Sequence, residues 1–408
     1  YKNKAFLKLK KGEDIVKKYK RLHIVLIAMF IFAAFFALNC FAEENNSKNL
    51  QEYYSKQMDK PDYVTVKAKI MDITFDDTKE NKKDIPIESD IRYQHLKIKL
   101  VSGKHKGEVY TVRNTVEMIS PYKLIFEKGD KLLLHLTEGE GNKVVNLKVY
   151  ERSREGIIYF IVALFMILLV AIGGRKGLKS AITLIFMGVL IVFVLLPLIR
   201  RGYNPILVSI FISILSVIFT MTLVSGANKK TLTAILGTIG GVIIAGIIAM
   251  IVGNMAMLTG VGNEDAQMLA YIPQNKYIDF KGLLYGGIII GALGAIMDVT
   301  MSVSSAMWEI KEIKPNIKTN ELIKSGMNIG KDIMGSMSNT LILAYAGGSI
   351  YIMLLFSMFK MDPLEIINLE PIASEIIRAM AGSIGLICAI PLTVIISASL
   401  AKSYYKKK

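Results

Sequence analysis

The sequence predicts a membrane all-α helical bundle of about eight transmembrane helices, joined to a small extracytoplasmic β domain. The chain has 408 residues, 52% of them hydrophobic, and several apolar runs reach the ~20 residues that a spanning helix needs. Residues 43–156 instead alternate apolar and polar residues, as half-buried strands do. The net charge of +16 then indicates membrane topology rather than nucleic acid binding, because Lys and Arg accumulate on cytoplasmic loops.

The N-terminal part predicts an anchor in the lipid bilayer. Residues 1–22 are strongly basic, and residues 23–42 are apolar. This order directs the N-terminus to the cytoplasm and predicts a transmembrane anchor over 23–42. A cleaved signal peptide is the alternative, because Cys40-Phe41-Ala42 loosely resembles a small-residue cleavage site. The long basic lead and the bulky Phe41 favour an uncleaved anchor.

Residues 43–156 are predicted to form the extracytoplasmic β-rich domain. Five runs in this segment alternate with period two, and glycines supply turns between them. The runs are Val64–Ile70, His95–Val101, Val109–Val112, Lys131–Leu136 and Val144–Tyr150. Five short strands indicate a small barrel or sandwich, with the OB-type barrel as one option. Lysines at alternate positions indicate a solvated strand face, and a domain outside the cell is not expected to bind nucleic acid.

Residues 157–401 are predicted to form a seven-helix membrane domain, and residues 402–408 a basic cytoplasmic tail. The predicted spans are Ile157–Ile172, Ala181–Ile199, Pro205–Val224, Leu232–Val252, Leu283–Ala306, Ile333–Phe359 and Ile376–Leu400. With these spans, fourteen Lys and Arg residues fall on the predicted cytoplasmic turns and tail, and five on the opposite side. Both termini are therefore expected in the cytoplasm.

Two further features of the membrane domain carry local predictions. The pairs Gly237/Gly241 and Gly287/Gly291 have the spacing that lets helix backbones approach closely. Residues Glu264–Tyr271 begin with two acidic residues, and we expect them to form a short interfacial helix.

Polar residues recur on two neighbouring spans, which are predicted to be antiparallel. On the first span, Asp298, Ser302 and Ser305 share one helix face, since they stand three or four residues apart. The second span carries a corresponding set at its start, formed by Asp332, Ser336 and Asn339. We expect the two polar faces to meet inside the bundle.

Asp298 carries most of this hypothesis. It follows fifteen uncharged residues, Leu283–Met297, which rise about 22 Å in a helix and so leave it inside a ~30 Å hydrocarbon layer. An ionisable group at that depth indicates function. The other polar residues have an alternative explanation without a function. Asp332 would lie at the membrane interface, where a carboxylate costs little free energy, and the serines would only permit close helix contact.

Two blocks of these spans resemble a known family. They are Gly294–Ala306 and Gly330–Tyr345, supported by the loop Leu258–Leu269 and by Glu375–Pro391. In these residues the chain is similar to the YibE/F-like family of bacterial multi-pass membrane proteins. Lys331 departs from the Arg expected there, but both are cations at a helix start. The resemblance implies a bacterial cell-membrane protein with an extracytoplasmic β domain, and it brings no settled activity.

The first predicted function is that of a transporter or channel-like protein for an ion or small solute. Carboxylate, amide and hydroxyl oxygens suit hard cations, whereas thioethers favour softer metals. Asp298, Asn339 and Met301 are therefore the candidate metal ligands. No phosphate-binding loop of the Gly-rich, Lys-Ser/Thr kind occurs in the chain. The sequence identifies no cofactor, and it leaves the oligomeric state open.

Two alternatives differ in class. One is a non-catalytic sensor or assembly factor that binds a partner through the outer β domain. The other is an intramembrane aspartyl enzyme, in which Asp298 and Asp332 share a proton. All four histidines precede the predicted seven-helix domain, which removes histidine-based catalysis there. The chain is accordingly predicted not to be an enzyme.

Overall fold

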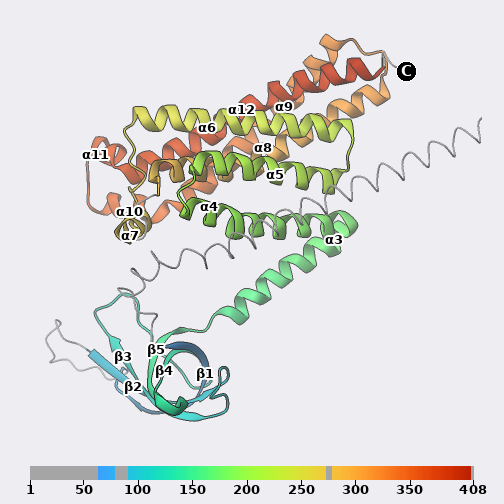
Figure 1. The fold of residues 1–408 in the computed structure, drawn as a ribbon. Coiled ribbons are helices and arrows are strands. Elements are labelled where there is room, and N and C mark those ends of the chain that lie inside the picture. Colours follow the sequence, from blue (N-terminus) through green and yellow to red (C-terminus); the bar gives the residue numbers. More distant parts are fainter. Residues whose placement is uncertain (1–62, 79–90, 273–277, 406–408) are drawn as a thin grey trace, which may run out of the picture. The chain divides into compact units, whose positions relative to one another are not determined.

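The computed structural model describes residues 63–78, 91–272 and 278–405 (Figure 1). The predicted basic segment 1–22 and the predicted anchor 23–42 lie outside the described residues. The chain divides into two compact units between Leu168 and Leu169.

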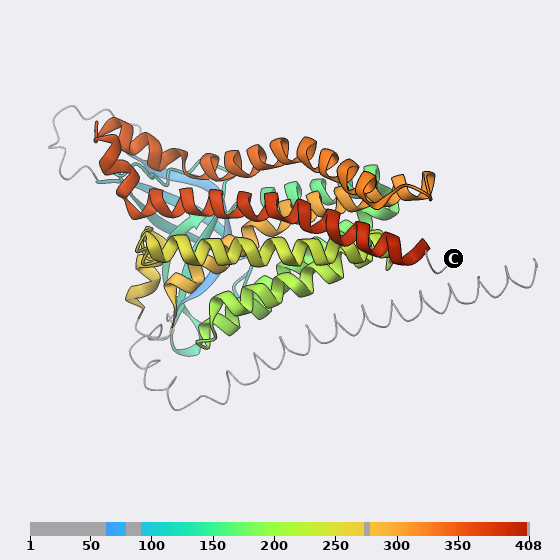
Figure 2. The same cartoon turned by 90° about the horizontal axis from the view of Figure 1, so that it is seen from above.

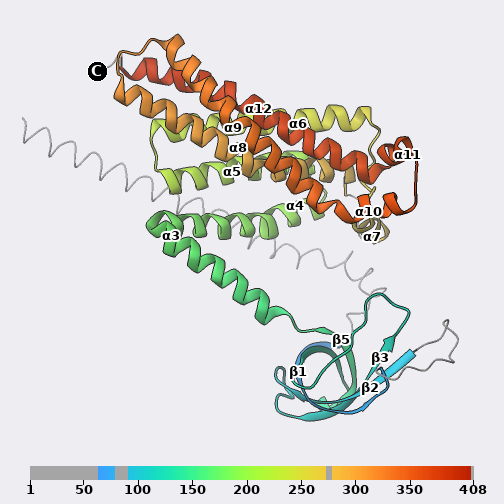
Figure 3. The same ribbon diagram turned by 180° about the vertical axis from the view of Figure 1, so that it is seen from behind.

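The first unit is a five-stranded antiparallel sheet. Its strands are β1 (Val64–Asp76), β2 (Ile91–Leu100), β3 (Val109–Glu117), β4 (Lys131–Glu138) and β5 (Val144–Arg152), with a short 3₁₀ helix, η2 (Glu140–Asn142), before β5. The strand order is β3-β2-β1-β4-β5, and the two edge strands contact each other, so the sheet curls into a near-barrel (Figure 3). All five predicted strands are present, although several begin earlier or end later than predicted.

Alternation along these strands builds the core of the β domain. Leu96, Leu132 and Leu134 are fully buried, while Lys67 and Lys99 on the same sheet point outward. This pattern is the one expected of strands with one face toward a core and one toward water. The prediction of solvated lysines at alternate positions is confirmed.

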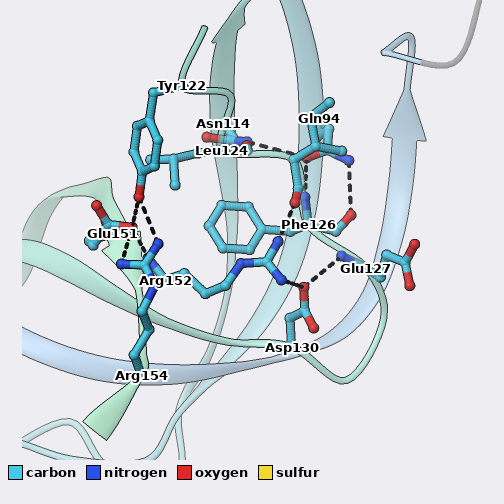
Figure 4. A network of polar contacts seen from close by, with 11 residues as sticks. Gln94, Asn114, Tyr122, Leu124, Phe126, Glu127, Asp130, Glu151, Arg152 and Arg154 are labelled. Atoms are coloured by element: carbon cyan, nitrogen blue, oxygen red, sulfur yellow. Dashed lines mark hydrogen bonds and ion pairs between the residues drawn. The ribbon is translucent and has the colours of Figure 1, made fainter. Parts of the chain in front are cut away.

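A buried hydrogen-bond network closes the segment between β3 and β4 onto this core (Figure 4). The Gln94 side chain accepts from the backbone N–H of Phe126 at 3.0 Å and donates to its carbonyl oxygen at 3.1 Å. Asn114 donates to the carbonyl oxygen of Leu124 at 2.7 Å. These two buried amides satisfy backbone groups that no strand pairs, and they hold Phe126, 1% exposed, in the core.

The second unit is helical. Its elements are α3 (Glu155–Leu190, which starts in the first unit), η3 (Ile191–Leu195), α4 (Leu196–Arg200), α5 (Pro205–Ser225), α6 (Lys229–Met255), α7 (Glu264–Tyr271), α8 (Phe280–Ile313), α9 (Thr319–Gly348), α10 (Ile350–Met358), α11 (Pro363–Asn368) and α12 (Glu370–Tyr405). The predicted helix Glu264–Tyr271 is present as α7, and Asn263 caps it by accepting from the backbone N–H of Ala266.

The described residues contain five helical runs that are long and apolar enough to cross a membrane, or six if a bent pair counts as one span. Two predicted spans, Ile157–Ile172 and Ala181–Ile199, fall in one run, Glu155–Arg200, which is broken at Gly174 (φ 53°). Another predicted span, Ile333–Phe359, is not one straight helix. It divides between α9 and α10, which meet at 57° directly after Gly347-Gly348.

Helices α6, α8 and α12 form the centre of the bundle and run side by side (Figure 2). A Cβ atom on Gly241 of α6 would lie 2.6 Å from the Ala389 Cβ and 3.0 Å from the Gly385 carbonyl oxygen of α12. The predicted close approach at Gly237/Gly241 is therefore confirmed. Of the second pair, Gly291 faces the Tyr345 hydroxyl, whereas open space lies beside Gly287.

The β domain is expected to fold without the helices, because its core comes from its own strands. A fragment of residues 63–154 should show a strand-type circular dichroism spectrum and a cooperative melt. Leu134→Ala should lower its free energy of unfolding by about 2–5 kcal/mol, since Leu134 is fully buried. Val145→Ala, at a position 69% exposed, is the control and should change it by less than about 0.5 kcal/mol. A fragment that melts without cooperativity contradicts the prediction.

The Gly241 contact should tolerate no larger side chain. Gly241→Val is expected to lower the thermal unfolding midpoint of the detergent-solubilised protein, because overpacking of this kind costs about 1–3 kcal/mol. Gly188→Val is the matched control, since nothing lies within 4 Å of a Cβ atom at Gly188. Equal midpoints for the two variants would show that the glycine contact does not limit the packing.

Candidate functional site

One face of α8 carries an uncovered stripe of small and polar residues. The exposed positions recur every three or four residues, which places them along one side of the helix. They are Gly287, Gly291, Gly294, Asp298, Ser302 and Glu309, with Ser305 half-buried among them. Open space lies beside Gly287 and Gly294. Asp298 is eighteen residues from the start of α8 and fifteen from its end, so about 22 Å of helix separates it from the nearer end.

Helix α9 has a stripe of the same kind. Its exposed positions are Asn328, Lys331, Asp332, Gly335, Ser336, Asn339 and Thr340. The Ser336 hydroxyl donates to the Ile333 carbonyl oxygen at 3.0 Å, and Thr340 donates to the Ser336 carbonyl oxygen at 2.9 Å. These hydroxyls are satisfied within the helix and still offer lone pairs to a ligand.

The heights of the two stripes along the bundle follow from two contacts between α8 and α9. A Cβ atom on Gly291 would meet the Tyr345 hydroxyl, and one on Gly326 would meet the Met307 side chain. Between these two contacts, Asp298 lies at the same height along the bundle as residues 336 and 337, to within one helical turn. Ser302 lies at the height of Asp332. All six predicted site residues therefore lie within a short stretch of the α8–α9 pair. Within the two described helices, no hydrogen bond joins the two sets.

Methionines line the border between the stripes and the core. Met297 and Met301 of α8, with Met334 and Met337 of α9, are partly buried and pack against the same central cluster. Among the described residues, no group of three or more His, Cys, Asp and Glu side chains is placed to hold a metal ion. Of the candidate metal ligands Asp298, Asn339 and Met301, one has a carboxylate side chain.

A second polar face of α8 is buried, and it is not among the residues predicted from the sequence. Thr300 and Ser304 point toward α6: the Thr300 and Thr238 hydroxyl oxygens are 2.6 Å apart, and Ser304 bonds to Thr233. Ser304 also donates to the Lys230 carbonyl oxygen at 2.7 Å. Thr300, Ser304, Thr233 and Thr238 are at most 1% exposed. The four-residue spacing of Thr300 and Ser304, next to Val299 and Val303, is the sequence signal that marks this face.

A third polar group lies beside the α8 stripe at the level of Gly291. Arg378 of α12 donates to Glu375 at 2.7 Å, and both lie near enough to Tyr345 to act on its hydroxyl electrostatically. Within the described structure, the buried Tyr345 hydroxyl and the Arg378 Nε have no hydrogen-bond partner. These two unsatisfied buried donors add to the polar groups beside the α8 stripe, and neither residue was predicted to belong to the site.

Comparison with models of known protein families shows to which family the chain belongs. Residues 161–403 match the model of the YibE/F-like protein family, and residues 62–151 match that of the YibE/F family N-terminal domain. The chain belongs to the YibE/F-like family. The two matches cover both the β domain and the helical unit of this YibE/F-like chain, which confirms the resemblance carried by Gly294–Ala306 and Gly330–Tyr345. No curated protein and no solved structure matches it.

The stripe on α8 is expected to face water rather than lipid in this YibE/F-like protein. In a background with Cys40→Ala and Cys388→Ala, Ser302→Cys should react with a membrane-impermeant thiol reagent, since thiolates form only where water reaches. Ser304→Cys, at a fully buried position, should not react.

A third variant distinguishes a water-facing position from a lipid-facing one. Ile395 is 55% exposed on α12 and carries an apolar side chain, so Ile395→Cys should remain unreactive if its surroundings are lipid. Labelling of Ser302→Cys at the slow rate of Ile395→Cys would contradict a water-facing stripe. The measurement is the rate of mass increase of the intact protein.

Proposed function

We propose that this chain carries a small ion or solute across the membrane along the polar stripes of α8 and α9. The observation that supports it is the uncovered position of Asp298 near the middle of a 34-residue apolar helix. A carboxylate in hydrocarbon costs about 2.5–3.5 kcal/mol on insertion scales. Such a residue is retained where it faces a water-filled path or a substrate.

Contrast with α3 supports the same proposal. The large apolar side chains that α3 exposes within the helical unit, such as Ile172, Leu184 and Ile185, suit contact with lipid tails. The exposed middle of α8, from Gly287 to Ser302, has no large apolar side chain. Two helices of one family domain thus present surfaces of opposite chemistry, which is what a bundle with a polar path on one side requires.

The chemistry of the stripes narrows the substrate class. One carboxylate with hydroxyl and amide oxygens suits a proton or a hard cation, and the methionines alongside suit a softer metal. We place a divalent metal ion or a proton-coupled solute ahead of sodium. The proposal includes no enzymatic activity, no cofactor and no nucleic acid partner.

We propose further that the protein lies in the bacterial cell membrane with both termini in the cytoplasm. The connection between α5 and α6, the connection between α8 and α9, and the end of α12 all lie at one end of the bundle (Figures 1 and 3). Basic residues gather at these places, among them Lys229, Lys230, Lys314, Lys318 and Lys402. Positive charge on one side of a membrane bundle indicates the cytoplasmic side.

A second candidate function is favoured by the outer surface of the β domain. The rings of Tyr63, His135 and Tyr150 form a continuous stack, with centroids 3.7 and 4.1 Å apart. Tyr63 is 40% and Tyr150 55% exposed. Exposed aromatic stacks are suited to binding flat or apolar partner groups. The chain would then be a membrane sensor or assembly factor that holds its partner through this stack.

An intramembrane aspartyl enzyme is the third candidate. It requires Asp298 and Asp332 to share a proton. Asp332 is level with Ser302, one helical turn from the level of Asp298, and both carboxylates are exposed. Because no hydrogen bond joins Asp298 and Asp332 in the two described helices, we rank this function below the other two.

Asp298→Asn is expected to abolish flux while leaving the protein inserted and folded. The change removes a charge from the apolar region, so insertion should be unimpaired. The assay is the purified protein in liposomes, with a pH-sensitive dye for protons and an indicator dye for Mn²⁺ or Zn²⁺. Glu309→Gln is the matched control, because Glu309 lies on the same stripe but only four residues from the end of α8.

The outcomes distinguish the candidates. Loss of flux in Asp298→Asn with normal flux in Glu309→Gln supports transport. Full flux in Asp298→Asn demotes Asp298 to a structural residue. If the unmodified protein moves none of these ions, the sensor function becomes the leading proposal.

A further inference from the structure

A pocket of about 260 Å³ opens at the end of the bundle where α8 leads into α9 and α12 ends. Among the described residues that line it are three lysines, Lys311, Lys318 and Lys402, and no acidic residue. The lysines come from the last turn of α8, the start of α9 and the last turns of α12. Three cations from three helices, without a carboxylate among the described lining residues, favour an anionic ligand.

Lys311 is the most unusual of the three, because it is only 7% exposed. Its Nζ donates to the Ile317 carbonyl oxygen at 3.3 Å, and Ile317 also lines the pocket. The ammonium group therefore lies at the pocket wall.

The start of α9 adds donors to this wall. Thr319 and the N-cap residue Lys318 line the pocket, and Lys318 makes no side-chain capping hydrogen bond. The first backbone N–H groups of a helix have no acceptor within the helix, and they carry partial positive charge. Glu321 in the first turn pairs with Lys314 at 3.7 Å and does not line the pocket.

We propose that this pocket binds a phosphate group, either as the headgroup of an anionic lipid or as free phosphate. Tetrahedral oxyanions suit the combination of point-charge ammoniums with a helix N-terminus. Ligand pockets for drug-sized molecules usually measure about 300–1,000 Å³, so this one fits a phosphate group better than a whole nucleotide. Ala398, Ala401 and Leu322 form an apolar part of the wall, which suits a headgroup with an attached acyl chain.

The proposal does not depend on the transport function, because it rests on different residues. Asp298 is thirteen residues from Lys311 along α8, or about 20 Å. A failure of ion flux therefore leaves the phosphate pocket unaffected, and the reverse holds as well.

The test uses the full chain, purified in a neutral detergent, and measures its thermal unfolding midpoint against ligand concentration. The ligands are phosphatidylglycerol in one arm and inorganic phosphate in the other, with phosphatidylcholine as the neutral lipid. The pocket variant combines Lys318→Gln and Lys402→Gln, which leaves the buried Lys311 in place. The control variant combines Lys314→Gln and Lys324→Gln, which removes the same charge from the same end of the bundle but outside the pocket.

The pocket variant should bind at least tenfold more weakly than the unmodified protein, and the control variant less than twofold more weakly. A response to phosphatidylglycerol alone identifies a lipid headgroup, and a response to inorganic phosphate in addition identifies free phosphate as a ligand. The proposal is overturned if neither ligand raises the midpoint, or if both variants weaken binding equally. Midpoints without ligand show whether each variant is folded.

Discussion

The rotation of α8 about its own axis is the constraint on which the candidate site depends. Two hydroxyl pairs with α6, Thr238 with Thr300 and Thr233 with Ser304, fix this rotation. Successive residues of an α-helix are about 100° apart, so Asp298, two residues before Thr300, lies on nearly the opposite side. The buried pairs and the exposed carboxylate are thus two consequences of one helix orientation.

Glycines at the centre of the bundle determine how α12 packs against α6 and α9. Gly241 and Gly385 bring α6 and α12 into backbone contact. Helix α12 is also the main support of α9. That support comes through Gly330 against Ile390 and Gly382 against Leu341. Helix α9 therefore packs on α12 with one side, and its polar side stays uncovered.

Much of this arrangement was predictable because it follows from local patterns. Period-two alternation located all five strands, the acidic start located α7, and the glycine spacing at Gly237/Gly241 located a close helix contact. The bend between α9 and α10 was missed because Ile333–Phe359 is uniformly apolar around Gly347-Gly348. Periodicity within one segment cannot show that Ser349 begins a new direction of the chain.

The candidate site was predictable in its residues but not in its orientation. Spacing alone grouped Asp298, Ser302 and Ser305 on one face. It gave no means of choosing between this face and the one with Thr300 and Ser304, since the members of both faces are three or four residues apart. The choice depends on α6, whose Thr233 and Thr238 are distant in sequence. Helix lengths were also underestimated: only residues 314–318 separate α8 from α9, so Asp332 lies thirteen residues inside a helix.

The unequal burial of α8 and α9 bears on how a polar path between them would open. Fifteen of the 34 residues of α8 are buried, against four of the 30 residues of α9. Elements with few buried contacts have the lowest free energy of local displacement. Helix α9 therefore moves at lower cost than α8, which stays fixed by its hydroxyl pairs. The lysine pocket holds the start of α9 between α8 and α12, and the bend at Ser349 frees its other end from a continuous helix. A ligand in that pocket would thus act on the helix that carries Ser336 and Asn339, without touching the helix face that carries Asp298.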